Sequence, residues 1–444
     1  MPVPDLIALR RPGTGIPRHP QILWPGRRSP AHAIGQKSDC HAGPRVERFR
    51  EAMNPSPSLL NRREFTQGLL MAAAATTATG PATWAANPAP RRIRTGVIGC
   101  GSVSNAYLPV LTQSPFVEVV SLCDIRPERA RRQGERFHVA HTYPHVDAML
   151  AGVPFEFLID LTDMQQHEQI NRRGIEAGKH VWSEKPIANS LKAGQELLRL
   201  SRARGTRLWG APITVQSPQF AFMARTLRSG ALGRIAAAHA FYGHEGPGWS
   251  SFFYEKGGGS LPDLAVYNLT SLTGLLGPVK HVSAMLSIVT PQREIDGKGR
   301  ITVTEEDNAM VLLDHGDGVI SHVQSGFNYF NPNGHVGKNE QRHTIQVTGS
   351  HGYVGLVGYD WEPLGVDVAT SSQPTLQRHA TDAQGYIWQQ GAALAAECLS
   401  TGKELLVSPE QALHVLEIIK AAHKSQETGR RIALTSTFRW PIVA

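Results

Sequence analysis

Short apolar segments alternate with helical segments from residue 95 to residue 215, and this alternation restricts the possible folds more than any other feature. Apolar runs lie at 97–98, 117–123, 155–162, 180–182 and 207–215, and helical patterns at 102–111, 166–178 and 191–205. Strands that alternate with helices are typical of a parallel, doubly wound sheet. In such sheets, ligands bind beyond the carboxyl ends of the strands.

The first apolar run leads into a turn with the features of a dinucleotide-binding site. Gly99 and Gly101 form the turn, and Ser102 and Val103 begin the next helix. Glycines allow backbone amides to approach a pyrophosphate, whose charge is favoured at a helix N-terminus. Asp124 ends the following strand 25 residues after Gly99, near the spacing expected for the carboxylate that binds the adenine ribose.

The choice between NAD and NADP depends on two neighbouring residues. Asp124 favours NAD because a carboxylate repels the 2′-phosphate of NADP, whereas Arg126 can pair with that phosphate. We expect NAD and keep NADP as the alternative. Ser104 replaces the third glycine of the usual pattern. A glycine-rich turn in some other α/β domain is therefore the competing interpretation.

The positive charge of the chain lies almost entirely in its first 94 residues. The formal net charge is +8, but residues 1–94 contain 14 basic and 5 acidic residues, and the remainder contains 31 and 32. The body has no basic stripe with interleaved aromatic residues, so we expect no nucleic-acid partner. The four cysteines lack metal-ligand spacing, and we expect no metal site.

The N-terminal region has the pattern of an export signal. Arg62 and Arg63 precede a short apolar run and then small residues, which is typical of a twin-arginine signal. The run is too short to span a bilayer, so we expect no stable membrane anchor. We interpret residues 1–52 as a disordered or misassigned leader, with Met53 as the true start, and 53–90 as signal peptide and linker. A disordered basic arm is the alternative to export by the twin-arginine machinery.

Four segments resemble the Gfo/Idh/MocA oxidoreductase family: "VIGCG", "CDIRPERA", "AGKHVWSEKPIA" and "GALGRI". The resemblance covers about residues 91–440. It implies that Glu184 and Lys185 lie near the nicotinamide, that Lys185 assists proton transfer, and that the Lys185–Pro186 bond is cis. It also implies that Thr162 and His167 border the cofactor, in a loop where Asp163 replaces the usual proline.

The segment 253–285 contains a second group of candidate catalytic residues. Asp263 and Tyr267 are four residues apart and therefore share one face of the predicted helix. The family commonly has histidine at the position of Tyr267, and a tyrosine there resembles its glucose–fructose oxidoreductase and dihydrodiol dehydrogenase branches. We expect a nearby Lys185 ammonium to lower the pKa of the phenol, so that Tyr267 donates or accepts the alcohol proton. Alternatively, Tyr267 only packs in an interface and Asp263 only caps the helix.

The predicted fold is a Rossmann-type doubly wound domain over residues 91–212, followed by an α+β domain over 213–444. Residues 280–360 alternate in apolar and polar character and contain two hairpin turns, "HGDG" and "GSHG". They predict an open, mainly antiparallel sheet. The resemblance implies that the outer face of this sheet joins copies of the chain, so we expect a homo-oligomer.

Together these features predict an exported NAD(P)-dependent oxidoreductase that acts on a sugar, polyol or related cyclic alcohol. Because nicotinamide cofactors are scarce outside the cytoplasm, we expect the cofactor to be held tightly and recycled between two substrates. Two alternatives remain open. One is a glycosidase that uses bound NAD for transient oxidation, and the other is a non-catalytic member of the family that keeps a cofactor or ligand.

Overall fold

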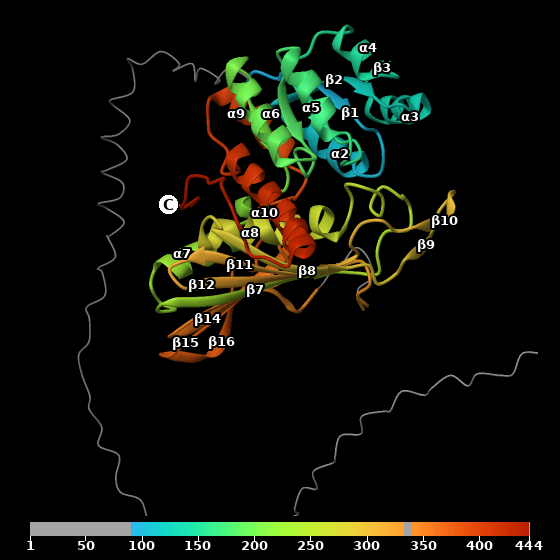
Figure 1. Cartoon of the computed structure of the whole chain (residues 1–444). Coiled ribbons are helices and arrows are strands. Elements are labelled where there is room, and N and C mark those ends of the chain that lie inside the picture. Colours follow the sequence, from blue (N-terminus) through green and yellow to red (C-terminus); the bar gives the residue numbers. More distant parts are fainter. Residues whose placement is uncertain (1–89, 333–339, 444) are drawn as a thin grey trace, which may run out of the picture. The chain divides into compact units, whose positions relative to one another are not determined.

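The computed structural model describes residues 90–332 and 340–443 (Figure 1). Residues Ala86–Ala444 form one compact unit. The predicted leader and the twin-arginine segment lie outside the described residues, so their interpretation stays a prediction.

The first layer is a parallel sheet of six strands, in the order β3-β2-β1-β4-β5-β6. Its strands are β1 (Ile93–Ile98), β2 (Val117–Cys123), β3 (His141–Tyr143), β4 (Phe157–Asp160), β5 (His180–Ser183) and β6 (Leu208–Gly210). Every residue of β4 is buried, as expected of a strand covered on both faces. The predicted doubly wound sheet is confirmed, and its order is that of dinucleotide-binding folds.

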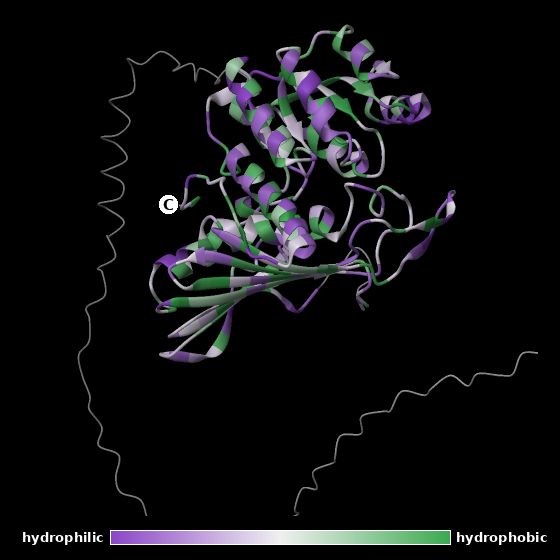
Figure 2. Cartoon of the chain, viewed as in Figure 1, coloured by the Kyte–Doolittle hydropathy of each residue, from purple (hydrophilic) through white to green (hydrophobic). Residues whose placement is uncertain are grey.

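Helices connect these strands on both faces of the sheet. They are α2 (Ser104–Gln113), α3 (Pro127–Phe137), α4 (Val146–Leu150), α5 (His167–Glu176) and α6 (Leu191–Ala203). Helix α3 is mostly hydrophilic along its length (Figure 2) and buries only Ala130, Gln133 and Gly134. Helix α6 begins at Ser190, whose side chain accepts a hydrogen bond from the amide of Ala193.

The second layer is a sheet of nine strands in the order β16-β15-β14-β13-β7-β12-β11-β8-β17. Its strands are β7 (Ile235–Gly243), β8 (His281–Ser287), β11 (Asn308–Gly316), β12 (Val319–Gly326), β13 (His343–Gly349), β14 (Gly352–Tyr359), β15 (Glu362–Thr370), β16 (Gln373–His379) and β17 (Ile432–Ala433). Only the β7–β12 pair is parallel, which confirms a mainly antiparallel sheet. Strands β9 (Gln292–Ile295) and β10 (Gly299–Thr302) form a separate hairpin.

Both predicted hairpin turns occur where the sequence placed them. Strands β11 and β12 are joined through Gly316, Asp317 and Gly318, which all have positive φ angles. Strands β13 and β14 pair from Gly349 and Gly352 outwards. Positive φ angles are the reason that glycine dominates such turns.

Helices cover one face of the large sheet. A 3₁₀ turn η1 (Thr214–Gln216) leads into α7 (Pro218–Arg228), and a π-helical turn η2 (Leu261–Ala265) continues directly as α8 (Val266–Leu276). Helices α7, α8 and α10 (Pro409–Thr428) lie on the same side of the sheet (Figure 1). The predicted helix therefore ends near Leu276 as expected, but its first turn is π-helical.

The chain returns to the first sheet after the second one is complete. Helix α9 (Gly391–Thr401) packs against α2, β1 and β2. A Cβ atom on Gly391 would lie only 2.2 Å from the ring of Trp182 in β5, so glycine permits this close contact. None of the helices in residues 90–332 and 340–443 is long and apolar enough to cross a membrane.

Candidate active site

The predicted dinucleotide turn joins β1 to α2 at the carboxyl end of the parallel sheet. Gly99 has φ = +91°, and a Cβ atom there would lie 2.4 Å from the carbonyl oxygen of Leu161. Only glycine fits where the backbone of residue 99 passes so close to the backbone of Leu161. Helix α2 begins at Val103 without a side-chain cap. Its first amides therefore point to a place where a pyrophosphate fits.

Asp124 lies beside this turn, at the end of β2. Its carboxylate accepts hydrogen bonds from the amides of Cys100 and Arg126, both at 2.8 Å. The side chain of Arg126 is exposed, as is that of Ser102. Asp124 thus holds the turn in shape from the end of β2.

Arg129 is a residue of this region that the sequence reasoning missed. A Cβ atom on Gly101 would lie 3.6 Å from a guanidinium nitrogen of Arg129, so this cation lies next to the turn. Asp163, which replaces the family's proline, lies within electrostatic reach of Arg129 and Asp124, and burial raises its pKa. Asp163 thus places a carboxyl group near Arg129 and Asp124, at the position where the family has proline.

Thr162 and His167 belong to the loop after β4. The amide and hydroxyl of Thr162 both donate to Asp160, at 3.0 and 2.6 Å. The ring nitrogens of His167 lie 2.8 and 2.9 Å from the carbonyl oxygens of Pro186 and Thr162. The buried imidazole of His167 therefore joins the two loops, and its ring nitrogens already face protein atoms.

Glu184 and Lys185 follow β5, and the Lys185–Pro186 bond is cis, as the resemblance implied. Glu184 is buried and accepts a 2.6 Å hydrogen bond from the hydroxyl of Tyr107 in α2. It also accepts a 3.1 Å bond from the amide of Lys185. The carboxylate of Glu184 therefore fixes the segment that carries Lys185.

Lys185 meets the second domain at Asp263. Its Nζ atom lies 2.6 Å from Oδ1 of Asp263 and 2.8 Å from the carbonyl oxygen of the same residue. The two side chains are only 11% and 12% exposed. An ion pair this poorly hydrated is held in place by strong, weakly screened attraction.

Tyr267 lies one turn beyond Asp263, and the Nζ atom of Lys185 is 5.3 Å from the centre of its ring. The sequence correctly predicts that the three residues gather, but the expected effect on the phenol is wrong. Burial raises the pKa of Tyr267 well above its usual value, and Glu184 and other neighbouring acidic groups raise it further. The ammonium of Lys185 contacts the ring and Asp263, and the raised pKa favours the protonated phenol of Tyr267, which can donate a hydrogen bond.

Two tyrosines that no sequence motif singles out complete the surroundings of Tyr267. Tyr107 is fully buried in α2, and Tyr242 in β7 meets Tyr267 edge to face at 5.9 Å. Both occupy positions in regular elements where an aromatic residue usually forms part of the core. Their proximity to Tyr267 depends on the packing of α2 and β7 around α8.

A loop rich in glycine and proline follows β7, at residues 244–249. His244 is buried between Tyr242 and Phe327, with ring centres 6.0 and 5.8 Å away. Trp249 is 44% exposed and packs edge to face on Phe253. The loop therefore offers an accessible aromatic ring next to the segment that leads to Asp263.

The arrangement combines a dinucleotide-type turn with a proton-transfer group at the same edge of one sheet. Lys185 and Asp263 form a charged pair, and Tyr267 supplies a neutral hydroxyl beside it. The residues around Gly99 and Asp124 fit a nicotinamide dinucleotide, because the turn is tight, the helix end is uncapped and a carboxylate lies beside the turn at the end of β2.

Two family models match the chain. Residues 93–211 match the model described as "Oxidoreductase family, NAD-binding Rossmann fold", and residues 220–355 match "GFO/IDH/MocA C-terminal domain". Together they cover most of both sheets.

Curated relatives are similar over part or most of their length. A dTDP-3,4-didehydro-2,6-dideoxy-alpha-D-glucose 3-reductase from Actinomadura kijaniata is 30% identical over 213 residues, which cover 45% of this chain and 60% of the relative. A D-apiose dehydrogenase from Rhizobium rhizogenes is 23% identical over 77% of this chain and 97% of the relative. The chain thus spans less than two thirds of the reductase.

Solved structures share the fold at low identity. The aldose-aldose oxidoreductase from Caulobacter crescentus, complexed with glycerol, has a TM-score of 0.66 and 21% identity over 78% of this chain and all of that chain. A levoglucosan dehydrogenase in complex with NADH and L-sorbose has a TM-score of 0.67 and 17% identity over the same shares. At these identities the likeness establishes the fold alone.

Proposed function

Because the chain belongs to the Gfo/Idh/MocA family of oxidoreductases, with an NAD-binding Rossmann domain, we propose that it transfers hydride between a nicotinamide cofactor and a sugar, polyol or related cyclic alcohol. The observation that carries this proposal is the pair formed by Lys185 and Asp263, with Nζ and Oδ1 2.6 Å apart. It brings an acid/base group from the second domain to the edge of the parallel sheet where nucleotides bind.

The nature of the substrate is suggested by the relatives. Their names describe a reductase of a deoxysugar nucleotide, a dehydrogenase of apiose and a dehydrogenase complexed with sorbose. All of these compounds carry secondary alcohols or the corresponding carbonyl group. An exposed Trp249 beside the site suits a sugar ring, whose C–H groups pack on aromatic faces.

The residues of the chain would manage the proton in this reaction. The bound nicotinamide supplies the chemistry of accepting or returning a hydride at carbon. When an alcohol is oxidised, its C–H bond provides the hydride and its O–H proton needs an acceptor, which Tyr267 cannot be while it is protonated. We therefore assign the acceptor role to the Lys185–Asp263 pair, in which Lys185 takes the alcohol proton as it passes one of its own protons to the carboxylate of Asp263, and a hydrogen-bond donor role to Tyr267. In the reverse direction, Lys185 returns a proton to the substrate oxygen and is reprotonated by Asp263.

Other residues would hold the cofactor. The amides at Gly101, Ser102 and Val103 suit the pyrophosphate, with Arg129 as the nearby cation, and Asp124 suits the ribose. Thr162 and His167 would act mainly by shaping the loop next to the site, because their side chains bond to protein atoms. Glu184 would orient Lys185.

Export, tight retention of the cofactor and self-association form part of the same proposal. The twin-arginine pattern supports export of a protein that folds before it is transported, with its cofactor bound. Self-association is supported by four exposed apolar side chains on strands β8, β11 and β12: Met285, Met310, Leu312 and Ile320. Exposed apolar patches on sheets commonly mark contacts between proteins.

The first test is to denature protein purified after export and to identify any released nucleotide by mass spectrometry and absorbance. Roughly one NAD or NADP per chain is expected. Sugar and polyol pairs are then screened for net transfer of hydride. Protein that is empty and also fails to bind added NAD(H) or NADP(H) would refute the oxidoreductase proposal.

Two variants separate the proposal from its alternatives. Turnover should fall by roughly 10²- to 10⁴-fold in Lys185→Met and substantially in Tyr267→Phe, while cofactor content is retained. Glycoside cleavage without net NADH would instead identify a glycosidase with transient redox chemistry. Turnover that survives the loss of both Lys185 and Tyr267 would be adventitious activity, and would favour a non-catalytic member of the family.

A further inference from the structure

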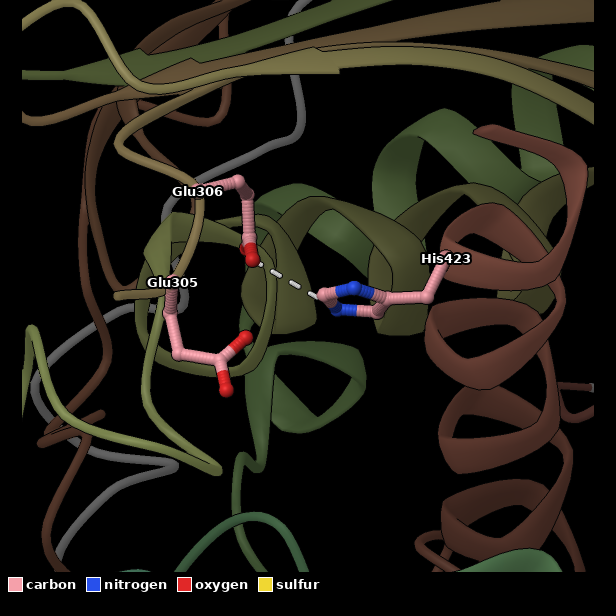
Figure 3. Close-up of side chains that lie close together, drawn as sticks. All are labelled: Glu305, Glu306 and His423. Carbon is pink, nitrogen blue, oxygen red and sulfur yellow. Dashed lines mark ion pairs between the residues drawn. The ribbon is translucent and has the colours of Figure 1, made fainter. Parts of the chain in front are cut away.

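A cluster of three potential metal ligands lies behind the start of the active-site helix. Glu305 and Glu306 belong to the segment between β10 and β11, and His423 belongs to α10. One ligand atom from each residue lies within 4.8 Å of the other two. Figure 3 shows both carboxylates and the imidazole converging, with Glu306 directly opposite His423.

Each carboxylate is already oriented by one of its oxygens. Oε1 of Glu305 accepts a 2.9 Å hydrogen bond from the amide of Gly257. Oε1 of Glu306 accepts a 2.8 Å bond from the amide of Leu261, the first residue of η2. In metal sites, hydrogen bonds of this kind orient the ligands and strengthen binding.

The second oxygen of Glu306 lacks a hydrogen-bond partner although it is buried. The side chain is 4% exposed, and its Oε2 atom lies 3.5 Å from Nε2 of His423, too far for a good hydrogen bond. A buried acceptor left unpaired lowers the stability of the fold. This oxygen is therefore aimed into the cluster without a group that satisfies it.

The donor atoms of the cluster suit a cation. Two carboxylates and one imidazole supply oxygen and nitrogen ligands to one place. Lys420 lies one turn before His423 on α10 and acts electrostatically on both carboxylates, so its ammonium is the cation with which a bound metal ion competes.

We propose that Glu305, Glu306 and His423 bind one divalent cation, and that Zn²⁺ fits this ligand set best. Three protein ligands with nitrogen and oxygen donors leave a fourth position for water, as in many zinc sites. Mg²⁺ and Ca²⁺ prefer six or more oxygen ligands.

Only a small contraction is needed to form this site. Zinc binds its ligands at about 2.0–2.2 Å, so two ligands of one tetrahedral ion lie about 3.4 Å apart. Ligand atoms at the 4.8 Å limit observed here must therefore close by about 1.4 Å. Glu305 is partly exposed and His423 is 27% exposed, so both can move by this amount.

Such an ion would connect α10 to the segment that begins the active-site helix. Gly257 and Leu261 are held by the same two carboxylates, and Asp263 follows two residues later. The proposed ion is a positioning element outside the catalytic group, and its binding does not depend on the proposed oxidoreductase activity.

The test uses the full chain without an affinity tag, stripped of metals with EDTA and titrated with Zn²⁺ by calorimetry. We expect one Zn²⁺ per chain with a micromolar or lower Kd, little competition from millimolar Mg²⁺, and a higher melting temperature with Zn²⁺. Glu306→Gln and His423→Asn should each weaken binding by at least tenfold and abolish the rise in melting temperature.

A matched control is available in the exposed pair of His281 and Asp314, whose Nδ1 and Oδ2 atoms lie 3.2 Å apart. His281→Asn should leave the binding of Zn²⁺ unchanged. Circular dichroism of the metal-free variants separates loss of binding from loss of fold. The proposal is overturned if the wild type binds no Zn²⁺, or if folded Glu306→Gln and His423→Asn variants bind as tightly as the wild type.

Discussion

Gly259 lies at the point where the catalytic helix begins, and its replacement by alanine gives a strict test of this part of the structure. Its φ angle is +106°, and a Cβ atom would lie 2.4 Å from both carboxylate oxygens of Glu306. Gly205 is the matched control. It also has a positive φ angle, +65°, but a Cβ atom there meets nothing within 4 Å.

The two substitutions share one cost and differ in another. A non-glycine residue at positive φ costs about 1–3 kcal/mol, and both variants carry this strain. Only Gly259→Ala also overpacks against a buried group, which typically costs about 1–3 kcal/mol more. Because the amide of Asp263 bonds to the carbonyl oxygen of Gly259, any shift at Gly259 also displaces the partner of Lys185.

The expected result is a free energy of unfolding about 1–3 kcal/mol lower for Gly259→Ala than for Gly205→Ala, measured from urea midpoints at equal slope. Turnover should fall in Gly259→Ala and stay near wild type in Gly205→Ala. In a Glu306→Ala background the clash is absent, so the extra cost of Gly259→Ala should largely disappear. Equal costs for the two glycines, or an extra cost that persists without Glu306, would refute this reasoning.

Three further predictions address cofactor, charge pair and pH. Asp124→Asn leaves the amides of Cys100 and Arg126 with one good acceptor between them, so the Kd for NAD measured by fluorescence titration should rise roughly tenfold; an unchanged Kd would contradict the placement of the ribose. Asp263→Asn leaves a buried ammonium without its anion, and should lower the free energy of unfolding by about 3–5 kcal/mol together with kcat; a stable, active variant would exclude this pair as the acid/base group. Burial lowers the pKa of His414 from 6.5 to about 4, so the folded protein keeps a neutral imidazole. The neutral imidazole contributes its full stability above pH 6.5, and this contribution is lost as the pH falls towards 4. This loss should reach about 3 kcal/mol. The free energy of unfolding should therefore fall less steeply with decreasing pH in His414→Gln than in the wild type, and equal slopes would refute the assignment.

Local sequence patterns were sufficient for most of the first domain. The Gly99 turn, the strand that ends at Asp124 and the later hairpin at Gly316 each depend on residues within one short segment. The cap at Ser408 and the stop at Gly429 were likewise readable, because a cap bonds to amides three residues away. The π-helical first turn before Val266 was not readable, since its first amide, that of Leu261, bonds to Glu306, 45 positions further along the chain.

The residue types of the candidate site could be found in the sequence, but their electrostatic behaviour could not. Lys185 and Asp263 stood out, and the structure joins them across 78 positions. The direction of the shift at Tyr267 was wrong in the sequence reasoning because it considered one neighbour. A pKa depends on burial and on every charge nearby, and those around Tyr267 include Glu184 and Asp263.

The sequence by itself determined the alternation of strands and helices in the first domain and the place of the nucleotide turn, because these follow from backbone geometry and from the periodicity of neighbouring residues; the family resemblance singled out Lys185. Only the tertiary structure decided that burial raises the pKa of Tyr267 and that Glu305, Glu306 and His423 meet behind the active-site helix. Side chains more than a hundred positions apart come together through the packing of α10 against the second sheet, and no local pattern contains that information.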